Sequence, residues 1–255
     1  MPLTTNHSPL ATVVIPARMA STRLPGKMLL RDTGRSLLEH THAAAQLAQL
    51  PTNVVVATDH PAIAAEVDRF GGQVLMTSAD CASGTDRVAE VARTLPEVDI
   101  FINLQGDEPK IDPAAIDTVM QLLLDDPSAE MATLATPIYD HSQFHDPACV
   151  KVVMDDAGRA LYFSRSPIPC HREPPADGAA LGHLHLGLYA YRRDFLLRLA
   201  ATPPAPLELA EKLEQLRVLQ LGAAICVGLV NHAAVGVDTP ADYSAFVQRQ
   251  LRRAG

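Results

Sequence analysis

Short apolar runs alternate with longer amphipathic segments along the first half of the chain. Residues 12–15, 53–57, 73–76 and 99–104 are almost entirely apolar, which is typical of strands that are buried on both faces of a parallel sheet. Segments long enough for helices of ten or more residues separate them. Strands that alternate with helices in this way predict an α/β fold with a mostly parallel, Rossmann-like sheet and helices on both faces.

Capping residues mark the expected helix boundaries. Ser36 and Glu39 have the spacing of a capping box. Asp59, followed by Pro61, predicts an N-cap and a first helical turn. Four helices are expected, over residues 36–50, 59–70, 83–95 and 112–124.

The pattern changes after residue 131. Residues 150–154 and 159–163 flank Asp155-Asp156-Ala157-Gly158, which is typical of a hairpin turn, so we expect an inserted antiparallel element. Residues 166–182 are rich in proline and glycine and predict a loop, mobile and lying over a site. The remaining elements expected are a strand over 184–191, helices over 194–200 and 206–219, a strand within 223–230, a turn at 237–240 and a helix to about 252.

The chain of 255 residues is long enough for one large domain with its own core. Residues 1–11 are expected to form a disordered lead-in. Residues 12–252 are expected to form a single domain, with about 140–195 as the inserted element. No internal repeat or linker divides the chain.

Composition limits the classes of partner. Four cysteines are scattered without a close pair and the first residues lack a signal pattern, which together predict a reducing cytosol. The longest apolar run, 221–230, is too short for a span of about 20 residues, so we expect no membrane insertion. The net charge of −8 argues against nucleic acid as a partner, because that binding needs an extended positive surface.

The segment 18–35 reverses this charge locally, with five cations and one acid, Asp32. It follows the first strand, which breaks at Pro16. Such a loop offers backbone N–H groups and charge-assisted hydrogen bonds to phosphate, and Gly26 is expected to allow close backbone approach. The loop matches neither the dinucleotide fingerprint nor the Walker P-loop, so it predicts a triphosphate site of another kind. A merely solvated basic loop is the alternative.

Carboxylates follow the fourth predicted strand in the motif Gln105-Gly106-Asp107-Glu108-Pro109. Open α/β sheets bind ligands at the carboxyl ends of their strands. A carboxylate that faces a phosphate loop fits Mg²⁺, so Asp107 is the expected first ligand and Asp238 the second. The alternative for Asp238 is a turn residue or N-cap before Pro240, and the residues alone favour the metal only slightly.

The predicted helix over 207–219 has two faces, with Leu209, Leu213 and Leu216 on one and Glu208, Glu211 and Gln215 on the other. The polar face is either solvated or a set of partners for sugar hydroxyls, and the spacing does not decide between them. A zinc site formed by Cys170, His171, His183 and His185 is disfavoured, because the spacing is irregular.

Taken together, the motifs closely resemble those of the 3-deoxy-manno-octulosonate cytidylyltransferases, the bacterial CMP-Kdo synthetases, from about residue 12 to 251. The motifs that carry the resemblance are Ile15-Pro16-Ala17-Arg18, Ser21-Thr22-Arg23-Leu24-Pro25-Gly26-Lys27, Ala57-Thr58-Asp59, Ser83-Gly84-Thr85-Asp86-Arg87, Gln105-Gly106-Asp107-Glu108-Pro109, Tyr162-Phe163-Ser164-Arg165, His185-Leu186-Gly187, Leu207-Glu208, Leu213-Glu214-Gln215-Leu216-Arg217 and Gly236-Val237-Asp238-Thr239-Pro240. The sialic-acid cytidylyltransferases share the Pro-Ala-Arg but have a different first loop, and they are the nearest alternative.

The resemblance implies a fold of the nucleotide-diphospho-sugar transferase type. It also implies that CTP and 3-deoxy-D-manno-octulosonate (Kdo) are coupled to CMP-Kdo, with release of pyrophosphate, for lipopolysaccharide synthesis. The sugar's own anomeric hydroxyl is then the nucleophile, so no catalytic triad is needed. The resemblance further implies a cytoplasmic homodimer, with residues 140–195 as the sugar-binding and dimerisation element. The alternative substrate is another 2-keto sugar acid, such as 8-amino-Kdo or a sialic acid.

The resemblance also implies roles for single residues. The catalytic positions are Arg18, Lys27, Asp107 and Asp238, of which Asp107 and Asp238 hold Mg²⁺. The nucleotide-binding positions are Arg18, Arg23, Lys27, Ser83 and Gln105. The sugar-acid positions are Arg87, Gln105, Arg165, His185, Tyr189, Glu211 and Gln215. The chain departs from the family pattern at Cys170, where tryptophan is common, and at Asp86.

Three functions remain open at this stage: a cytidylyltransferase, a nucleotidyltransferase of other specificity, and a non-catalytic nucleotide-binding domain. The presence of both Asp107 and Asp238 favours the two enzymes.

Overall fold

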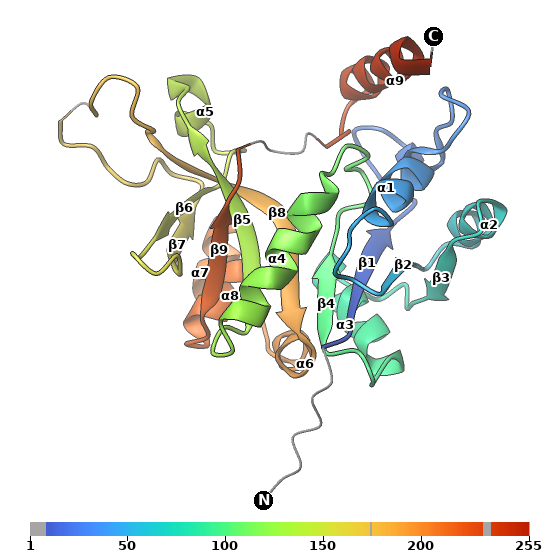
Figure 1. Ribbon diagram of the computed structural model, residues 1–255, viewed down its shortest axis with the longest axis horizontal. Coiled ribbons are helices and arrows are strands. Elements are labelled where there is room, and N and C mark those ends of the chain that lie inside the picture. Colours follow the sequence, from blue (N-terminus) through green and yellow to red (C-terminus); the bar gives the residue numbers. More distant parts are fainter. Residues whose placement is uncertain (1–8, 174, 232–235, 255) are drawn as a thin grey trace, which may run out of the picture.

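One mixed sheet organises the computed structural model, which describes residues 9–173, 175–231 and 236–254 (Figure 1). The nine strands of this sheet in the described residues are β1 Ala11–Ala17, β2 Asn53–Thr58, β3 Gln73–Met76, β4 Ile100–Asn103, β5 Met131–Ile138, β6 Lys151–Met154, β7 Ala160–Ser164, β8 Gly182–Arg192 and β9 Ile225–Leu229. The expected α/β class is confirmed.

The strand order is β3-β2-β1-β4-β8-β5-β9. β1, β2, β3 and β4 run parallel, so their carboxyl ends meet at one edge. β8 is antiparallel to both β4 and β5. β6 pairs with the first part of β8, at residues 183 and 184, and with β7, and both pairings are antiparallel. The inserted antiparallel element is therefore confirmed, and it turns at Gly158, whose φ of 76° suits a residue without a side chain.

Helices cover both faces of the sheet (Figure 1). The helices of the described residues are η1 Lys27–Leu29, α1 Leu37–Ala45, α2 Pro61–Arg69, α3 Gly84–Thr94, α4 Pro113–Asp125, α5 His141–His145, α6 Arg193–Ala201, α7 Pro206–Glu211, α8 Gln215–Gln220 and α9 Pro240–Ala254. Side chains alternate along β1, so Val13 and Ile15 pack with α1, α2 and α4, whereas Val14 packs with α3 and α6. None of these helices is long and apolar enough to span a membrane.

The predicted boundaries differ from the structure at three places in the first half of the chain. β1 begins at Ala11, inside the predicted lead-in, whose residues 1–8 lie outside the described part. The first helix ends at Ala45 instead of near residue 50. α2 is capped by His60, whose Nδ1 accepts from the N–H of Ala62 at 3.2 Å, and not by Asp59. Asp59 is instead 3.4 Å from the Arg87 guanidinium, which directs its carboxylate away from the helix.

The predicted helix over 206–219 is two helices, because Lys212 adopts a left-handed φ of 55° and ends α7. The predicted division into faces is wrong as a result. Leu209 is 53% exposed, whereas Glu208 and Gln215 are buried. Burial is the largest effect on the pKa of Glu208 and raises it, but the hydrogen bonds from Arg217 and from the Ala205 N–H, with the charge of Arg217, together lower the pKa, so a charged carboxylate is retained inside.

Candidate active site

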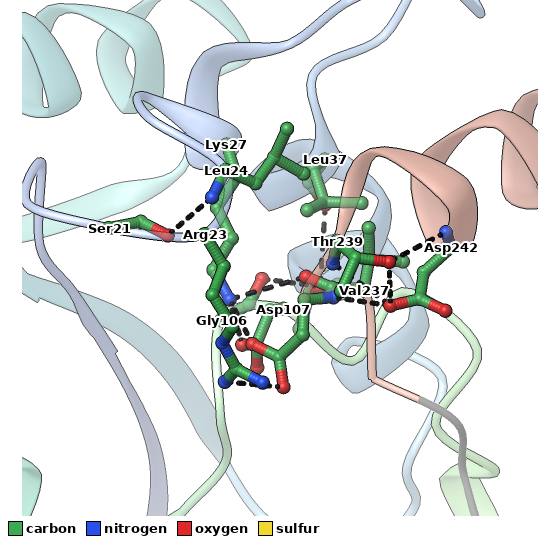
Figure 2. Close-up of polar contacts among 12 residues, drawn as sticks. Ser21, Arg23, Leu24, Lys27, Leu37, Gly106, Asp107, Val237, Thr239 and Asp242 are labelled. Atoms are coloured by element: carbon green, nitrogen blue, oxygen red, sulfur yellow. Dashed lines mark hydrogen bonds and ion pairs between the residues drawn. The ribbon is translucent and has the colours of Figure 1, made fainter.

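Lys27 lies at the centre of the cationic loop and is only 8% exposed. Its Nζ donates to the carboxylate of Asp107, to Asp238 Oδ1 at 2.9 Å and to the carbonyl of Val237 at 3.2 Å. Figure 2 shows this side chain reaching toward Asp107 and Val237. The loop after β1 and two later loops therefore meet at one ammonium group.

Two opposing effects act on the pKa of Lys27. Burial lowers it, and the hydrogen bonds and charges of Asp107 and Asp238 raise it by more, so the net shift is upward. Lys27 is therefore a firmly charged ammonium at neutral pH.

Gly26 sets the direction of Lys27 by its backbone conformation. Its φ of 63° lies in the left-handed region, and η1 begins at the next residue. No atom lies within 4 Å of a Cβ built at Gly26, so the structure gives no sign of a tight approach. Gly26 is thus a turn residue with open space beside it, and the close approach of its backbone to a phosphate stays a prediction.

Asp107 reaches the cationic loop because the chain after β4 is held close to β1. A Cβ at Gly106 would lie 3.3 Å from the carbonyl oxygen of Pro16 and 3.1 Å from Met28 Cε, so glycine suits this contact. Thr41 Oγ1, on α1, donates to the Gly106 carbonyl at 2.9 Å. The sheet edge and α1 together fix the Asp107 backbone.

Asp238 is not the cap of α9. Asp242 Oδ2 accepts from the N–H of Thr239 at 2.9 Å, and the Asp242 N–H donates back to Thr239 Oγ1 at 3.2 Å. This reciprocal pair is a capping box centred on Thr239. The carboxylate of Asp238 is therefore available for Lys27 and for Arg23, whose guanidinium lies 3.0 Å from it.

A small apolar cluster anchors the loop that carries Asp238. It consists of Leu24, Leu37, Val237, Tyr243 and Phe246, which join the cationic loop, α1 and α9. The N–H of Val237 also donates to the Asp107 carbonyl at 2.8 Å. The two carboxylates are thus held together by packing and by a backbone hydrogen bond.

The donor set at this point fits Mg²⁺. Two carboxylates converge on one cation, and oxygen ligands supplemented by water and substrate phosphate are what this hard ion prefers. Within residues 9–173, 175–231 and 236–254, no group of three or more His, Cys, Asp or Glu side chains is placed to hold a metal. Asp107 and Asp238 would therefore supply two ligands, and the substrate and water the remainder.

Glu108 differs from its neighbour Asp107. It lines a cavity of about 190 Å³ together with Ile111, Leu134 and Leu188. Burial, and secondly the charge of Asp107, raises the pKa of Glu108 to about 8, so this carboxyl is mostly neutral at pH 7. Of the two acids in the motif, only Asp107 offers a charge to a cation.

Arg18, Arg23 and Ser83, which are also predicted to bind nucleotide, lie in the cationic loop or in the segment that contacts it. Arg18 donates to the carbonyls of Cys81 at 2.9 Å and Ala82 at 3.3 Å, and so ties the cationic loop to the segment before α3. Ser83 caps α3 in a capping box with Asp86, and Arg23 is largely exposed. Their predicted contacts with nucleotide stay predictions.

A cavity of about 460 Å³ lies near the carboxylates: Gln105, two residues before Asp107, lines it, although Asp107 and Asp238 themselves do not. It is bounded by the end of β4, residues 184–191 of β8, the start of α3, the loop at 148–150 and the break between α7 and α8. Of the predicted sugar-acid residues, the four that line it are Gln105, His185, Tyr189 and Gln215.

His185 is a neutral group in this cavity. Burial lowers its pKa to about 3, and its ring packs against Phe163 and Tyr189 at centroid distances of 4.9 and 5.5 Å. Its Nε2 lies 3.0 Å from Thr133 Oγ1, which has the Leu188 carbonyl as acceptor for its one proton at 2.8 Å. We assign the proton of His185 to Nε2 on this basis, which leaves Nδ1 as an acceptor.

Three predicted sugar-acid residues do not line the cavity. Arg87 is buried against Thr77 and Asp59 at the ends of β3 and β2. Arg165 donates to the carbonyls of Pro147 and Glu211 at 2.9 and 2.7 Å, and the Glu211 carboxylate accepts from the Arg165 N–H. Arg165 and Glu211 therefore hold the cavity wall in place, and a direct contact with sugar stays a prediction.

Asn103, which was not among the predicted site residues, lines the same cavity from the last position of β4. The available signal was a single polar residue at the end of an otherwise apolar strand.

A mixed α/β sheet that brings a lysine and two carboxylates together at its carboxyl edge, near a polar cavity, fits a nucleotidyltransferase. The family model described as "Cytidylyltransferase" matches residues 12–225. Many relatives agree in name, and the chain belongs to the family of the 3-deoxy-manno-octulosonate cytidylyltransferases.

The relatives match almost end to end. Proteins named 3-deoxy-manno-octulosonate cytidylyltransferase from Rhodopirellula baltica and Geobacter sulfurreducens are 49% and 48% identical, over 93% of this chain and 97% and 98% of their own. A solved structure of a CMP:2-keto-3-deoxy-manno-octonic acid synthetase complexed with CTP has a TM-score of 0.90 and 43% identity, covering 96% of this chain and 99% of that one. A 4-diphosphocytidyl-2C-methyl-D-erythritol synthase from Anaerococcus prevotii, 14% identical with a TM-score of 0.61, shares the fold.

Proposed function

We propose that this protein transfers CMP from CTP to the anomeric hydroxyl of Kdo, giving CMP-Kdo and pyrophosphate for lipopolysaccharide synthesis. In this reaction the hydroxyl oxygen attacks the α-phosphorus and loses its proton, while the bond from that phosphorus to the bridging oxygen breaks. The observation that carries the proposal is the convergence of Lys27, Asp107 and Asp238 at one point of the sheet edge, near the polar cavity, in a chain of this family.

The cationic residues supply charge to the triphosphate. Lys27 is rigidly held, with a raised pKa, and offers a positive charge close to departing pyrophosphate. The Arg18 guanidinium is oriented by two carbonyls of the segment before α3. Preoriented charges of this kind stabilise a transition state without reorganising when the reaction occurs.

We propose that the enzyme depends on Mg²⁺ held by Asp107 and Asp238. When bound, the ion would polarise the reacting phosphate and favour the ionised form of the attacking hydroxyl. The chain's own part is to hold both carboxylates ready, through the contact at Gly106 and the capping box at Thr239.

The cavity side chains orient the sugar acid. Gln105 and Gln215 carry amide donors, Tyr189 carries a hydroxyl, and His185 Nδ1 is an acceptor. Holding the attacking hydroxyl in line with the phosphate accounts for a large share of the rate in such transfers.

We also propose a cytoplasmic homodimer that assembles through the inserted element at about 140–195. Exposed apolar side chains at Tyr139 and Leu161 lie in or beside this element, and they are suited to burial against a second copy. Sedimentation of wild type and of Leu161→Lys tests the dimer, and the variant is expected to dissociate. A wild-type protein that sediments as a monomer at micromolar concentration would contradict the proposal.

A pyrophosphate-release assay tests the activity. Each of the four nucleoside triphosphates is combined with Kdo, 8-amino-Kdo and a sialic acid, with and without Mg²⁺. We expect turnover only with CTP and Mg²⁺, and highest kcat/KM with Kdo. Equal or higher kcat/KM with another sugar acid would reassign the substrate. Full turnover in the presence of a chelator would contradict the proposed dependence on Mg²⁺.

A further inference from the structure

Two buried carboxamides in the 460 Å³ cavity have unpartnered atoms. Asn103 is 2% exposed and its Oδ1 has no hydrogen-bond partner. Gln215 is 4% exposed and its Nε2 has none either. Only one other buried side-chain atom in the described residues is unpartnered, Arg87 Nε, and Arg87 does not line this cavity.

An unpartnered buried polar atom destabilises a fold by about 1–3 kcal/mol, so most such atoms in native proteins are paired. The other residues of β4 are Ile100, Phe101 and Ile102, all fully buried and apolar. Asn103 is paired through its backbone with Val14 on β1 and Tyr189 on β8. A leucine would satisfy this position in the sheet without leaving a polar atom unpaired.

A ligand bound in the cavity would supply the hydrogen-bond partners that the protein itself lacks. The unpartnered atom of Asn103 is an acceptor and that of Gln215 is a donor, so a ligand for both must donate and accept. Sugar hydroxyls do both, whereas a carboxylate only accepts. The terminal torsion of a carboxamide is broad in energy, so a small rotation directs its unpartnered atom at a ligand.

We propose that Asn103 is a substrate-binding residue whose carboxamide pairs with one hydroxyl of the sugar acid. This inference rests on the proposed function and adds one of the residues that line its cavity. Asn103 stands two positions before Gln105, so the strand end and the motif after it contact the same substrate.

The test uses Asn103→Leu, with Asn103→Ala as a second variant of smaller volume. We expect KM for Kdo to rise about tenfold, the effect of leaving one hydroxyl without its partner, while KM for CTP changes less than about twofold. The melting temperature without substrate is expected to be unchanged or higher for Asn103→Leu, because the substitution removes an unpaired group. The matched control is Asn53→Leu on β2, whose amide is already paired with Gln73 Oε1 at 2.7 Å, and it leaves both KM values unchanged.

Kdo analogues that each lack one hydroxyl give the second readout. Wild type is expected to discriminate against one of them about tenfold, and Asn103→Leu to treat that analogue and Kdo alike. If wild type is active but both Asn103 variants keep the wild-type KM for Kdo, or lose stability without a change in KM, the inference is wrong and the proposed function stands. If wild type is inactive with CTP and Kdo, the proposed function and this inference both fall.

Discussion

Asp107 and Asp238 direct their carboxylates at the same group, the Lys27 ammonium, although they come from loops at distant points in the chain. Two carboxylates against one buried ammonium leave a surplus of negative charge, which the exposed Arg23 offsets only in part. This charge balance is the physical reason to expect a divalent cation.

Removal of the shared ammonium should affect stability in a metal-dependent way. Lys27→Met leaves two carboxylates close together without their partner, so we expect a loss of about 1–3 kcal/mol in the free energy of unfolding without divalent ions. Mg²⁺ should then raise the melting temperature of Lys27→Met by more than that of wild type. Thermal unfolding with and without Mg²⁺ measures this.

The control for that experiment is Arg23→Met, which removes an exposed partner of Asp238 and should cost less than about 1 kcal/mol. Equal responses of Lys27→Met and wild type to Mg²⁺ would contradict a metal site at these carboxylates.

The same lysine is expected to act in the transition state. Lys27→Ala should lower kcat more than it raises KM for CTP, because a fixed charge near the leaving phosphates interacts most strongly as charge develops there. Steady-state kinetics with CTP as the varied substrate measures the two constants. A raised KM at unchanged kcat would make Lys27 a ground-state binder.

Much of the fold was predictable because the buried strands are continuous apolar runs. Val13, Val14 and Ile15 are fully buried, as their pattern indicates. The break at Lys212 was not predictable, because a left-handed lysine carries no local signal of the kind that glycine gives. Glu208 was placed on a polar face because its buried partner Arg217 is a tertiary contact that helical spacing does not reveal.

The site was predictable to the extent that its residues stand in loops after strands. Asp107 was identified in that way. That Asp238 is not the N-cap of α9 could not be predicted, because only the hydrogen bonds between Thr239 and Asp242 show that Thr239 is the cap. Asn103 was missed because it ends an apolar strand, and only the cavity and its unpartnered oxygen distinguish it from a structural residue.

Acid should destabilise the protein partly through His185. Its pKa is lowered to about 3 by burial, so between pH 6.5 and 3 the unfolded state binds a proton that the folded state does not. Stability therefore falls as pH decreases through this window, at up to 1.36 kcal/mol per unit for this one group. Lowering the pH from 7 to 5 should cost wild type about 2 kcal/mol more than His185→Asn.

Urea unfolding at the two pH values, without substrate, measures this difference. His183→Asn is the comparison on the same strand: burial also lowers the pKa of His183, but this histidine is only partly buried, so its replacement should reduce the loss by less than His185→Asn does. The same loss in wild type and His185→Asn would show that His185 is not held neutral.

The most direct test of the account is the Mg²⁺ dependence of turnover in Asp238→Asn. The amide keeps a hydrogen-bond acceptor for Lys27, and Thr239 still caps α9, so the melting temperature should stay nearly unchanged. The lost charge should lower turnover at least about tenfold, which is ~1.4 kcal/mol of transition-state stabilisation, and raise the Mg²⁺ concentration for half-maximal rate. Asp242→Asn changes a nearby carboxylate, in the first turn of α9, that accepts from Thr239 and not from Lys27, and it should leave that concentration unchanged. Near-normal turnover of a folded Asp238→Asn, with an unshifted Mg²⁺ dependence, would contradict the central claim that the two carboxylates share one metal.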